Sequence, residues 1–232
     1  MTLYFRQLLA GRDFGQKTPF AAQMENFVYL IGDRDTGECV VVDPAWAVDD
    51  LVAVAAADDM RVTGALVTHY HPDHVGGDIF GIHIEGLPRL MEVAPCPVHV
   101  HRLEAQGVRA VTGLSASDLV QHDSGDVVQV GKVGVELLHT PGHTPGSLCF
   151  RLSGALVSGD TLFLQGCGRV DLPGGDSDEL FRSLAKLRGL PGDTVLYPGH
   201  RYGGANAPMH AVVEKNPMMQ VADLARWRMM MG

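Results

Sequence analysis

The chain has 232 residues, of which 46% are hydrophobic and 19% charged, and its formal net charge at pH 7 is −9. This composition excludes a disordered chain, and the length favours one large domain over two. The negative charge, with no cluster of Lys and Arg, argues against a nucleic-acid partner, and no apolar run approaches the roughly 18 residues that a membrane-spanning helix needs.

Apolar patterns predict a hairpin and a helix early in the chain. Residues 26–31 and 38–42 are β-branched and aromatic runs joined by a turn rich in Gly and Asp, which is typical of a β-hairpin. Residues 48–57 carry apolar side chains at helical spacing, with Asp49 and Asp50 in the first turn, where carboxylates suit the positive end of the helix dipole. We therefore expect strands and helices to alternate here.

The next segments lead into a dense run of histidines and then leave this pattern. A strand is predicted at 64–68, directly before the histidines. Residues 79–93 are rich in Gly, Ile and Leu, contain Pro88 and do not fit the order of strands and helices around them, so we interpret them as an insertion, a loop or short helix over a site.

The second half of the chain predicts another sheet and another helix. Between residues 127 and 158, short apolar runs alternate with Gly and Pro-Gly pairs, the pattern of successive hairpins. A helix with one apolar face is expected at 178–187 and a strand at 194–197. Two sheets packed face to face, with helices outside, would bury both sets of strands. We expect a single domain over residues 1–232, with a short C-terminal extension at 203–232.

The cysteines and the termini add further expectations. The four cysteines are widely spaced with no C-x-x-C pair, which indicates reduced thiols. The N-terminus lacks the charged and apolar regions of a secretory signal, so we expect a cytoplasmic protein. The Met-rich end at 227–231 either fills a groove of its own chain or covers the surface of a homodimer, and the adaptability of Met side chains favours the first interpretation.

Candidate metal ligands follow four predicted strands. In the first group, alternate residues His69 and His71 can point the same way, while the turn begun at Pro72 brings Asp73 and His74 to the other side. The remaining candidates follow later strands and are His143, Asp160 and His200. Two adjacent metal positions are therefore predicted.

These residue types suit Zn²⁺ or Fe²⁺, which imidazole and carboxylate bind well. Two such ions about 3.5–4 Å apart would share a bridging water whose pKa falls toward neutrality, and that water would be the nucleophile. Asp160 has two carboxylate oxygens and can bridge both ions. The other histidines have no such context, and we expect ordinary hydrogen-bonded roles for His83, His99, His101, His122, His139 and His210.

The ordered set of ligand-type residues from 69 to 200 resembles the pattern of the metallo-β-lactamase superfamily. This resemblance implies an α/β (α+β) fold, a four-layer αββα sandwich of two mixed β-sheets with the site between the sheet edges. It also implies one metal on His69, His71 and His143. The second metal would lie on Asp73, His74 and His200, with Asp160 between the two, and Asp73 would orient the hydroxide or accept its proton.

Other segments indicate which branch of the superfamily the chain resembles. Asp160 stands where secreted β-lactamases of this fold carry Cys, which argues against antibiotic hydrolysis, and RNA-cleaving members usually carry large added domains. The segments 159–163, 166–171 and 197–202 resemble the glyoxalase II and persulfide dioxygenase branch, whose members act on thiol conjugates. A lactonase is a lower-ranked alternative.

The ligand set leaves two activities open. The glyoxalase II resemblance implies hydrolysis of a thioester with two Zn²⁺ ions or a mixed Zn/Fe pair. The dioxygenase resemblance implies oxidation of a thiol persulfide at one Fe²⁺, held by His69, His143 and Asp160. Pro72 and Ser147 resemble the hydrolases, and we favour that activity.

Outside the ligands, the resemblance suggests contacts for an anionic thiol carrier. Tyr202, two residues after the last histidine, ranks first, followed by Arg169 and Arg201. Gly168-Arg169-x-Asp171 and Tyr202 are closer to the dioxygenases. By analogy with the fold, Asp43 at a strand end would support the metal-binding loop.

Overall fold

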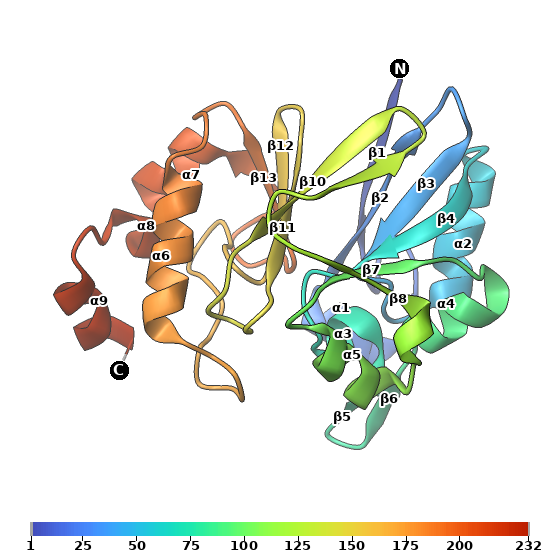
Figure 1. Cartoon of the computed structure of the whole chain (residues 1–232), viewed down its shortest axis with the longest axis horizontal. Helices are drawn as coiled ribbons and strands as arrows, with labels where there is room; N and C mark the ends of the chain where they lie inside the picture. Colours follow the sequence, from blue (N-terminus) through green and yellow to red (C-terminus); the bar gives the residue numbers. More distant parts are fainter. Residues whose placement is uncertain (1, 232) are drawn as a thin grey trace.

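Two mixed β-sheets form the centre of the computed structural model, which describes residues 2–231. In the first sheet the strand order is β1-β2-β3-β4-β7-β8; in the second it is β14-β13-β12-β11-β10-β9. The two sheets pack face to face, and helices cover both outer faces (Figure 1). This confirms the predicted αββα sandwich.

Antiparallel and parallel pairing are combined in both sheets. In the first, β1, β2 and β3 are antiparallel neighbours, and β3, β4, β7 and β8 are parallel. Its strands are β1 (Leu3–Leu9), β2 (Phe27–Asp33), β3 (Glu38–Val42), β4 (Arg61–Leu66), β7 (Val98–His101) and β8 (Leu119–His122). Those of the second sheet are β9 (Val127–Val130), β10 (Val133–His139), β11 (Leu148–Leu152), β12 (Ala155–Gly159), β13 (Val195–Pro198) and β14 (Ala207–Pro208).

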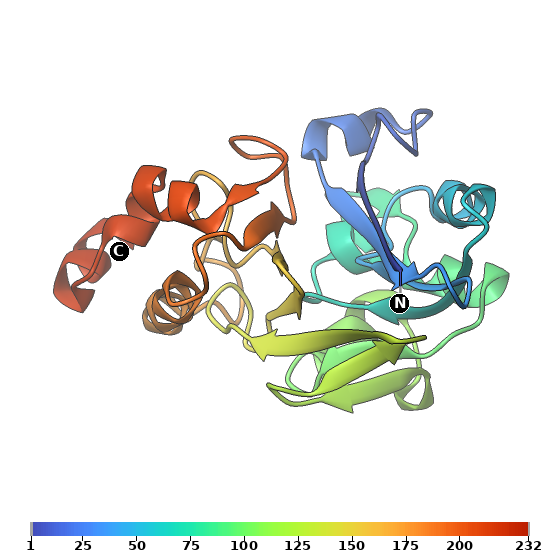
Figure 2. The same ribbon diagram turned by 90° about the horizontal axis from the view of Figure 1, so that it is seen from above.

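The helices divide between the two outer faces. Those beside the first sheet are α2 (Val48–Ala57), α4 (Leu87–Val93) and α5 (Ala105–Thr112), and those beside the second are α6 (Ser177–Arg188), α7 (Met209–Lys215), α8 (Pro217–Gln220) and α9 (Leu224–Met231). Seen from above, the C-terminal helices lie on the far side of the molecule from the N-terminal half (Figure 2). Shorter elements are α1 (Pro19–Met24), α3 (Pro72–Val75), the 3₁₀-helix Ala116–Asp118, and the β5 (Gly77–Ile79) and β6 (Ile82–Ile84) hairpin.

Side-chain alternation along the strands builds the layered core. Successive strand residues point to opposite faces. In β4 and the residue after it, Ala65 and Val67 therefore pack against the helices, while Leu66 packs between the two sheets. Because both faces of the central strands are covered, their sequences read as nearly continuous apolar runs.

Several predicted elements agree closely with the structure, and two need correction. The helix at 48–57 has the predicted bounds, and the helix at 178–187 extends by one residue at each end. The segment 79–93 contains a short helix, one of the two predicted alternatives, but this helix, α4, buries Leu87 and Leu90 against the first sheet. The residues before α4 complete the β5–β6 hairpin.

The Met-rich end is only partly a core element. Trp227 is fully buried against α6, whereas Met229 and Met230 are 80% and 45% exposed. The core interpretation was therefore correct for Trp227 and wrong for these two methionines. Among residues 2–231, none of the helices combines the length and the hydrophobicity that crossing a bilayer requires.

Candidate metal centre

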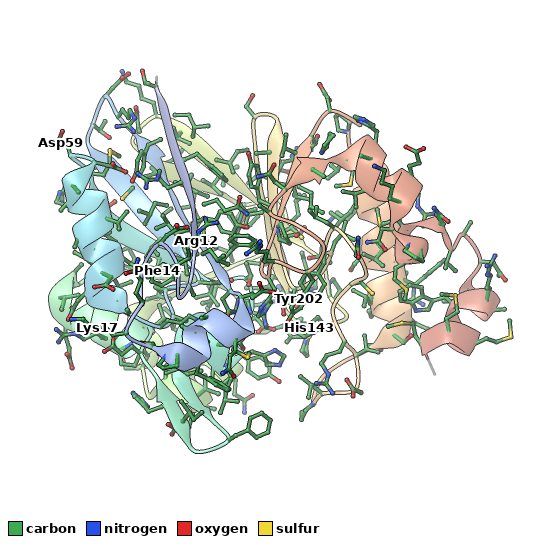
Figure 3. The ribbon with its side chains drawn as sticks, turned by 180° about the vertical axis from the view of Figure 1, so that it is seen from behind. Arg12, Phe14, Lys17, Asp59, His143 and Tyr202 are labelled. Carbon is green, nitrogen blue, oxygen red and sulfur yellow. The ribbon has the colours of Figure 1, made fainter. Side chains whose placement is uncertain are left out.

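The strands β4, β10, β12 and β13 end near one another, and the segments directly after them, α3 included, carry every predicted ligand. His69 and His71 follow β4, His143 follows β10, and Asp160 and His200 follow β12 and β13. Figure 3 shows His143 and Tyr202 close together where the two halves of the sandwich meet. The structure thus gathers side chains from two sheets at one site.

The first group consists of His69, His71 and His143, whose nearest ligand atoms lie within 4.8 Å of one another. His71 is extended at φ −64° and ψ 142°, and the following Pro72 starts α3 and turns the chain. The Nε2 atom of His143 lies 3.0 Å from Nδ1 of His71. His69 and His71 therefore share one side of the loop, as their spacing predicted.

The second group consists of Asp73, His74 and His200, also within 4.8 Å of one another. Asp73 and His74 lie on α3, on the other side of the turn at Pro72. The Nε2 atoms of His74 and His200 are 3.2 Å apart, and Oδ2 of Asp73 is 3.3 Å from Nε2 of His200. This group forms a second position next to the first.

Asp160 lies between the two groups. Its Oδ2 atom is 3.8 Å from Nε2 of His143 and 3.4 Å from Nε2 of His200, and its Oδ1 atom is 3.5 Å from Nε2 of His74. A Cβ atom on Gly199 would lie 2.3 Å from Oδ1 of Asp160, so only glycine lets the β13 loop approach so closely. One carboxylate thus reaches both groups.

Unpaired atoms in this cluster fit a metal site. Nε2 of His69 and Oδ1 of Asp160 are buried, and neither has a hydrogen-bond partner among the described residues. Leaving buried polar atoms unpaired is costly, so such atoms call for an explanation. Donor atoms of His and Asp are also the types that borderline divalent cations bind. The residues present therefore suit divalent metal ions.

The pKa shifts of the histidines in this cluster also fit a metal site. Burial, with neighbouring His143 and His74, lowers the pKa of His71 to about 4, so its imidazole stays neutral and able to ligate a metal. Burial also opposes the charged form of His200, but the carboxylates of Asp160 and Asp73 outweigh it and raise the pKa of His200 to about 10. A divalent cation would replace such protons as the positive charge facing the carboxylates.

Asp43 supports the first loop, as the analogy with the fold implied. Its Oδ1 atom accepts a hydrogen bond from the Thr68 backbone N–H (2.8 Å), and its Oδ2 atom accepts one from the Thr68 hydroxyl (2.6 Å). The same Oδ2 atom is 2.9 Å from Nδ1 of His74. Asp43 therefore leaves Nε2 of His74 to face the centre of the cluster.

Sequence reasoning missed Asn26, which holds Asp73, and Trp46, which holds Asn26. The buried side-chain amide of Asn26 donates to both the backbone carbonyl (3.1 Å) and Oδ2 (3.0 Å) of Asp73. The indole N–H of Trp46 in turn donates to Oδ1 of Asn26 at 3.1 Å. A lone Asn before a buried strand and a lone Trp after one carry no periodic signal, so only the folded chain reveals their connection.

The contact between Asn26 and Asp73 leads to a testable prediction. Asn26→Ala removes both hydrogen bonds to Asp73, and we expect it to weaken divalent-metal binding at the second group by about 10- to 100-fold, the usual effect of losing a partner behind a ligand. Competition titration with a chromophoric chelator measures the change. Asn206→Ala is the control, because Asn206 is exposed and donates only to the side chain of Gln7. Unchanged affinity in the Asn26 variant would contradict the positioning role.

The three predicted substrate contacts lie in different surroundings. Tyr202 is 44% exposed and stacks on His200, with ring centroids 4.9 Å apart and an interplanar angle of 6°. The guanidinium of Arg169 is paired with Asp171, while its backbone carbonyl lies 2.7 Å from Nδ1 of His143. Arg201 is exposed and lies 3.8 Å from Glu25. Of these three side chains, Tyr202 is the one whose ring contacts a residue of the cluster, His200.

Neither Cys167 nor the six other histidines joins the cluster. Burial raises the pKa of the Cys167 thiol to about 12, so it is not an activated nucleophile. Among the histidines, His99 pairs with His122 at 2.8 Å and His101 stacks on His139. His83 pairs with Asp78, and His210 with the carbonyl of Gly192.

A four-layer sandwich with a His- and Asp-rich centre at the sheet edges defines a class of metal-dependent enzymes. The model of the metallo-beta-lactamase superfamily matches residues 24–200. The chain belongs to this superfamily.

Individual relatives are consistent with this membership. A hydroxyacylglutathione hydrolase of Rhodopseudomonas palustris (strain BisB18) is 34% identical over 214 residues, which are 90% of this chain and 76% of the relative. The crystal structure of ETHE1 from Myxococcus xanthus is 30% identical, with a TM-score of 0.75 over 94% of this chain and 86% of that one. TTHA1623, solved in a di-iron-bound form, is 29% identical, with a TM-score of 0.68 over 84% and 95% of the two chains. Together with the family, the similarity to the hydroxyacylglutathione hydrolase supports a metallo-hydrolase.

Proposed function

We propose that this protein hydrolyses a thioester of a low-molecular-weight thiol with a binuclear metal centre. The observation that carries the proposal is the placement of Asp160 within 3.8 Å of nitrogens from both groups of ligand-type residues. A carboxylate there suits two ions that share one site. The 34% identity to a hydroxyacylglutathione hydrolase supports the thioester.

In this proposal each group of residues holds one ion. His69, His71 and His143 hold the first, and Asp73, His74 and His200 hold the second. Asp160 contributes to both. Two Zn²⁺ ions suit the donor set, and Fe²⁺ or a mixed Zn/Fe pair is the alternative. The similarity to TTHA1623, solved in a di-iron-bound form, supports iron.

When bound, the ions lower the pKa of a coordinated water and polarise a carbonyl group. The chain supplies the rest. We propose that Asp73 orients that water or accepts its proton; the amide of Asn26, which donates to Oδ2 of Asp73, supports this role by holding the carboxylate. Because a thiolate is a good leaving group, the thioester needs no strong general acid from the chain. None of the described cysteines is needed as a nucleophile.

Tyr202, Arg169 and Arg201 are proposed contacts for the substrate. The Tyr202 ring lies against His200 with part of its surface open to solvent, so it can pack against a thiol carrier beside the metal centre. Arg169 lies in the segment after β12 and Arg201 in the segment after β13. Both are exposed cations, which suit an anionic carrier. Such soluble thiol conjugates are typical of the cytoplasm, where we place the reaction.

A second candidate is persulfide oxidation at a single Fe²⁺. The similarity to ETHE1 favours it, as does the Gly168-Arg169-x-Asp171 segment. His69, His143 and Asp160 would be the ligands in this case. A lactonase ranks third because no observation favours it specifically.

Metal analysis followed by an activity assay tests the proposal. The protein is purified without added metal or chelator, and its metals are counted per chain by elemental analysis. We expect about two ions, chiefly zinc, and hydrolysis of S-acyl thioesters of glutathione followed by thiol release. About one iron per chain, with oxygen consumption on a thiol persulfide and no thioester cleavage, would reject the hydrolase in favour of the second candidate.

A further inference from the structure

Glu104 is a buried carboxylate that the proposed reaction does not use. It precedes the first residue of α5, and none of its surface is exposed. Burial raises its pKa, whereas hydrogen bonds from Thr144, Gly146 and Tyr70 act in the opposite direction. Burying a carboxylate costs free energy unless donors compensate it, so the identity of those donors indicates what the residue is for.

All of these donors belong to the two loops that carry the first group of metal ligands. Oε2 of Glu104 accepts from the backbone N–H of Tyr70 at 2.8 Å, and Tyr70 stands between His69 and His71. Oε1 accepts from the hydroxyl of Thr144, directly after His143, at 2.8 Å and from the backbone N–H of Gly146, three residues after His143, at 2.7 Å. One carboxylate therefore joins both loops.

The two loops come from different sheets, so local sequence does not determine their separation. The first follows β4 and the second follows β10. Close packing reinforces the hydrogen bonds: a Cβ atom on Gly146 would lie 2.8 Å from Cγ of Glu104, and one on Gly107 of α5 would lie 2.6 Å from Cγ of Tyr70. Glu104 and α5 thus form a rigid support behind both loops.

We propose that Glu104 is a positioning residue that sets the distance between the His69/His71 loop and His143, and so determines the affinity of the first metal position. The inference rests on the proposed function only in treating His69, His71 and His143 as a metal position. It does not depend on the substrate, because His69 and His143 are ligands in both the hydrolase and the dioxygenase.

Glu104→Gln provides the main test. The amide keeps the shape of the side chain but replaces one acceptor with an N–H₂ donor, so it cannot accept from both loops at once. Zn²⁺ affinity is measured by stepwise competition with a chromophoric chelator. We expect one dissociation constant to rise by about 10- to 100-fold, as for other partners behind metal ligands, and a second constant, where present, to stay unchanged.

Asp33→Asn is the matched control. Asp33 is also a fully buried carboxylate that accepts from backbone amides, those of Asp35 and Lys132, but it lies at the end of β2 away from the metal centre. We expect this variant to lose stability without a change in metal affinity. Wild-type affinity in folded Glu104→Gln, or an equal loss in Asp33→Asn, would overturn the proposal.

A milder variant keeps the test decisive if Glu104→Gln does not fold. Thr144→Val removes one donor to Glu104, and we expect it to raise the same dissociation constant by a smaller factor; an unchanged constant would count against the proposal. The readout also separates the two hypotheses. If the wild-type protein cleaves no thioester but Glu104→Gln still weakens zinc binding, the proposed function fails and the role of Glu104 stands.

Discussion

Asp160→Ala is expected to remove at least one of the bound metal ions and to lower turnover by well over about 10²-fold, more than the loss of a partner behind a ligand. The side chain lies between two groups of ligands and is only 12% exposed. No other described carboxylate reaches His143, His74 and His200 together within 4 Å. Elemental analysis of the purified variant and an initial-rate assay measure the two effects.

A control separates this effect from the loss of any surface acid. Asp123→Ala removes a carboxylate that is 59% exposed and pairs with Arg102, and surface changes of this kind typically shift stability by no more than about 0.5 kcal/mol. We expect this variant to keep its metal and its activity. Full metal content and wild-type turnover in Asp160→Ala would show that the centre does not depend on a shared carboxylate.

The second large effect concerns stability. Trp227→Ala is expected to lower the free energy of unfolding by about 3–5 kcal/mol, as for other buried aromatic residues. Trp227 is fully buried, its ring lies 5.7 Å from that of Phe181, and its indole N–H donates to the backbone carbonyl of Ser177 on α6. The substitution would remove this buried contact of α9 with α6 and leave the exposed pair of Arg228 with Asp178. Urea unfolding followed by circular dichroism measures the loss.

Met229→Ala is the matched control from the same helix. Met229 is 80% exposed, so we expect its variant to unfold within about 0.5 kcal/mol of the wild type. Neither residue lies in the metal centre, and both variants should keep their metal while folded. Equal stability of the Trp227 and Met229 variants would show that α9 does not stabilise the sandwich.

The predictable part of the site was the grouping of its ligand-type residues. His69, His71, Asp73 and His74 lie so close in sequence that strand alternation and one turn at Pro72 place them on two sides of the same loop. These residues act through local geometry, which a short stretch of sequence contains.

The residues that hold the ligands were less predictable. Asn26 and Glu104 are separated from the ligands they support by tens of positions along the chain, and each stands alone in its segment. An isolated polar residue next to a buried strand has no pattern that distinguishes a support from an ordinary surface group. Similarly, helical spacing could not tell that Trp227 is buried while Met229 faces solvent.

The sequence by itself determined the sandwich, the ligand types and the order in which the ligand loops follow their strands, because hydrophobic periodicity and ligand spacing are local properties. Only the tertiary structure decided how near the two sheets bring those loops. Nitrogens of His71 and His143, which follow strands of different sheets, lie 3.0 Å apart, and the buried carboxylate of Glu104 accepts hydrogen bonds from both of their loops. The β13 loop approaches Asp160 closely at Gly199. Such contacts join distant segments, and their energies exist only once the chain has folded.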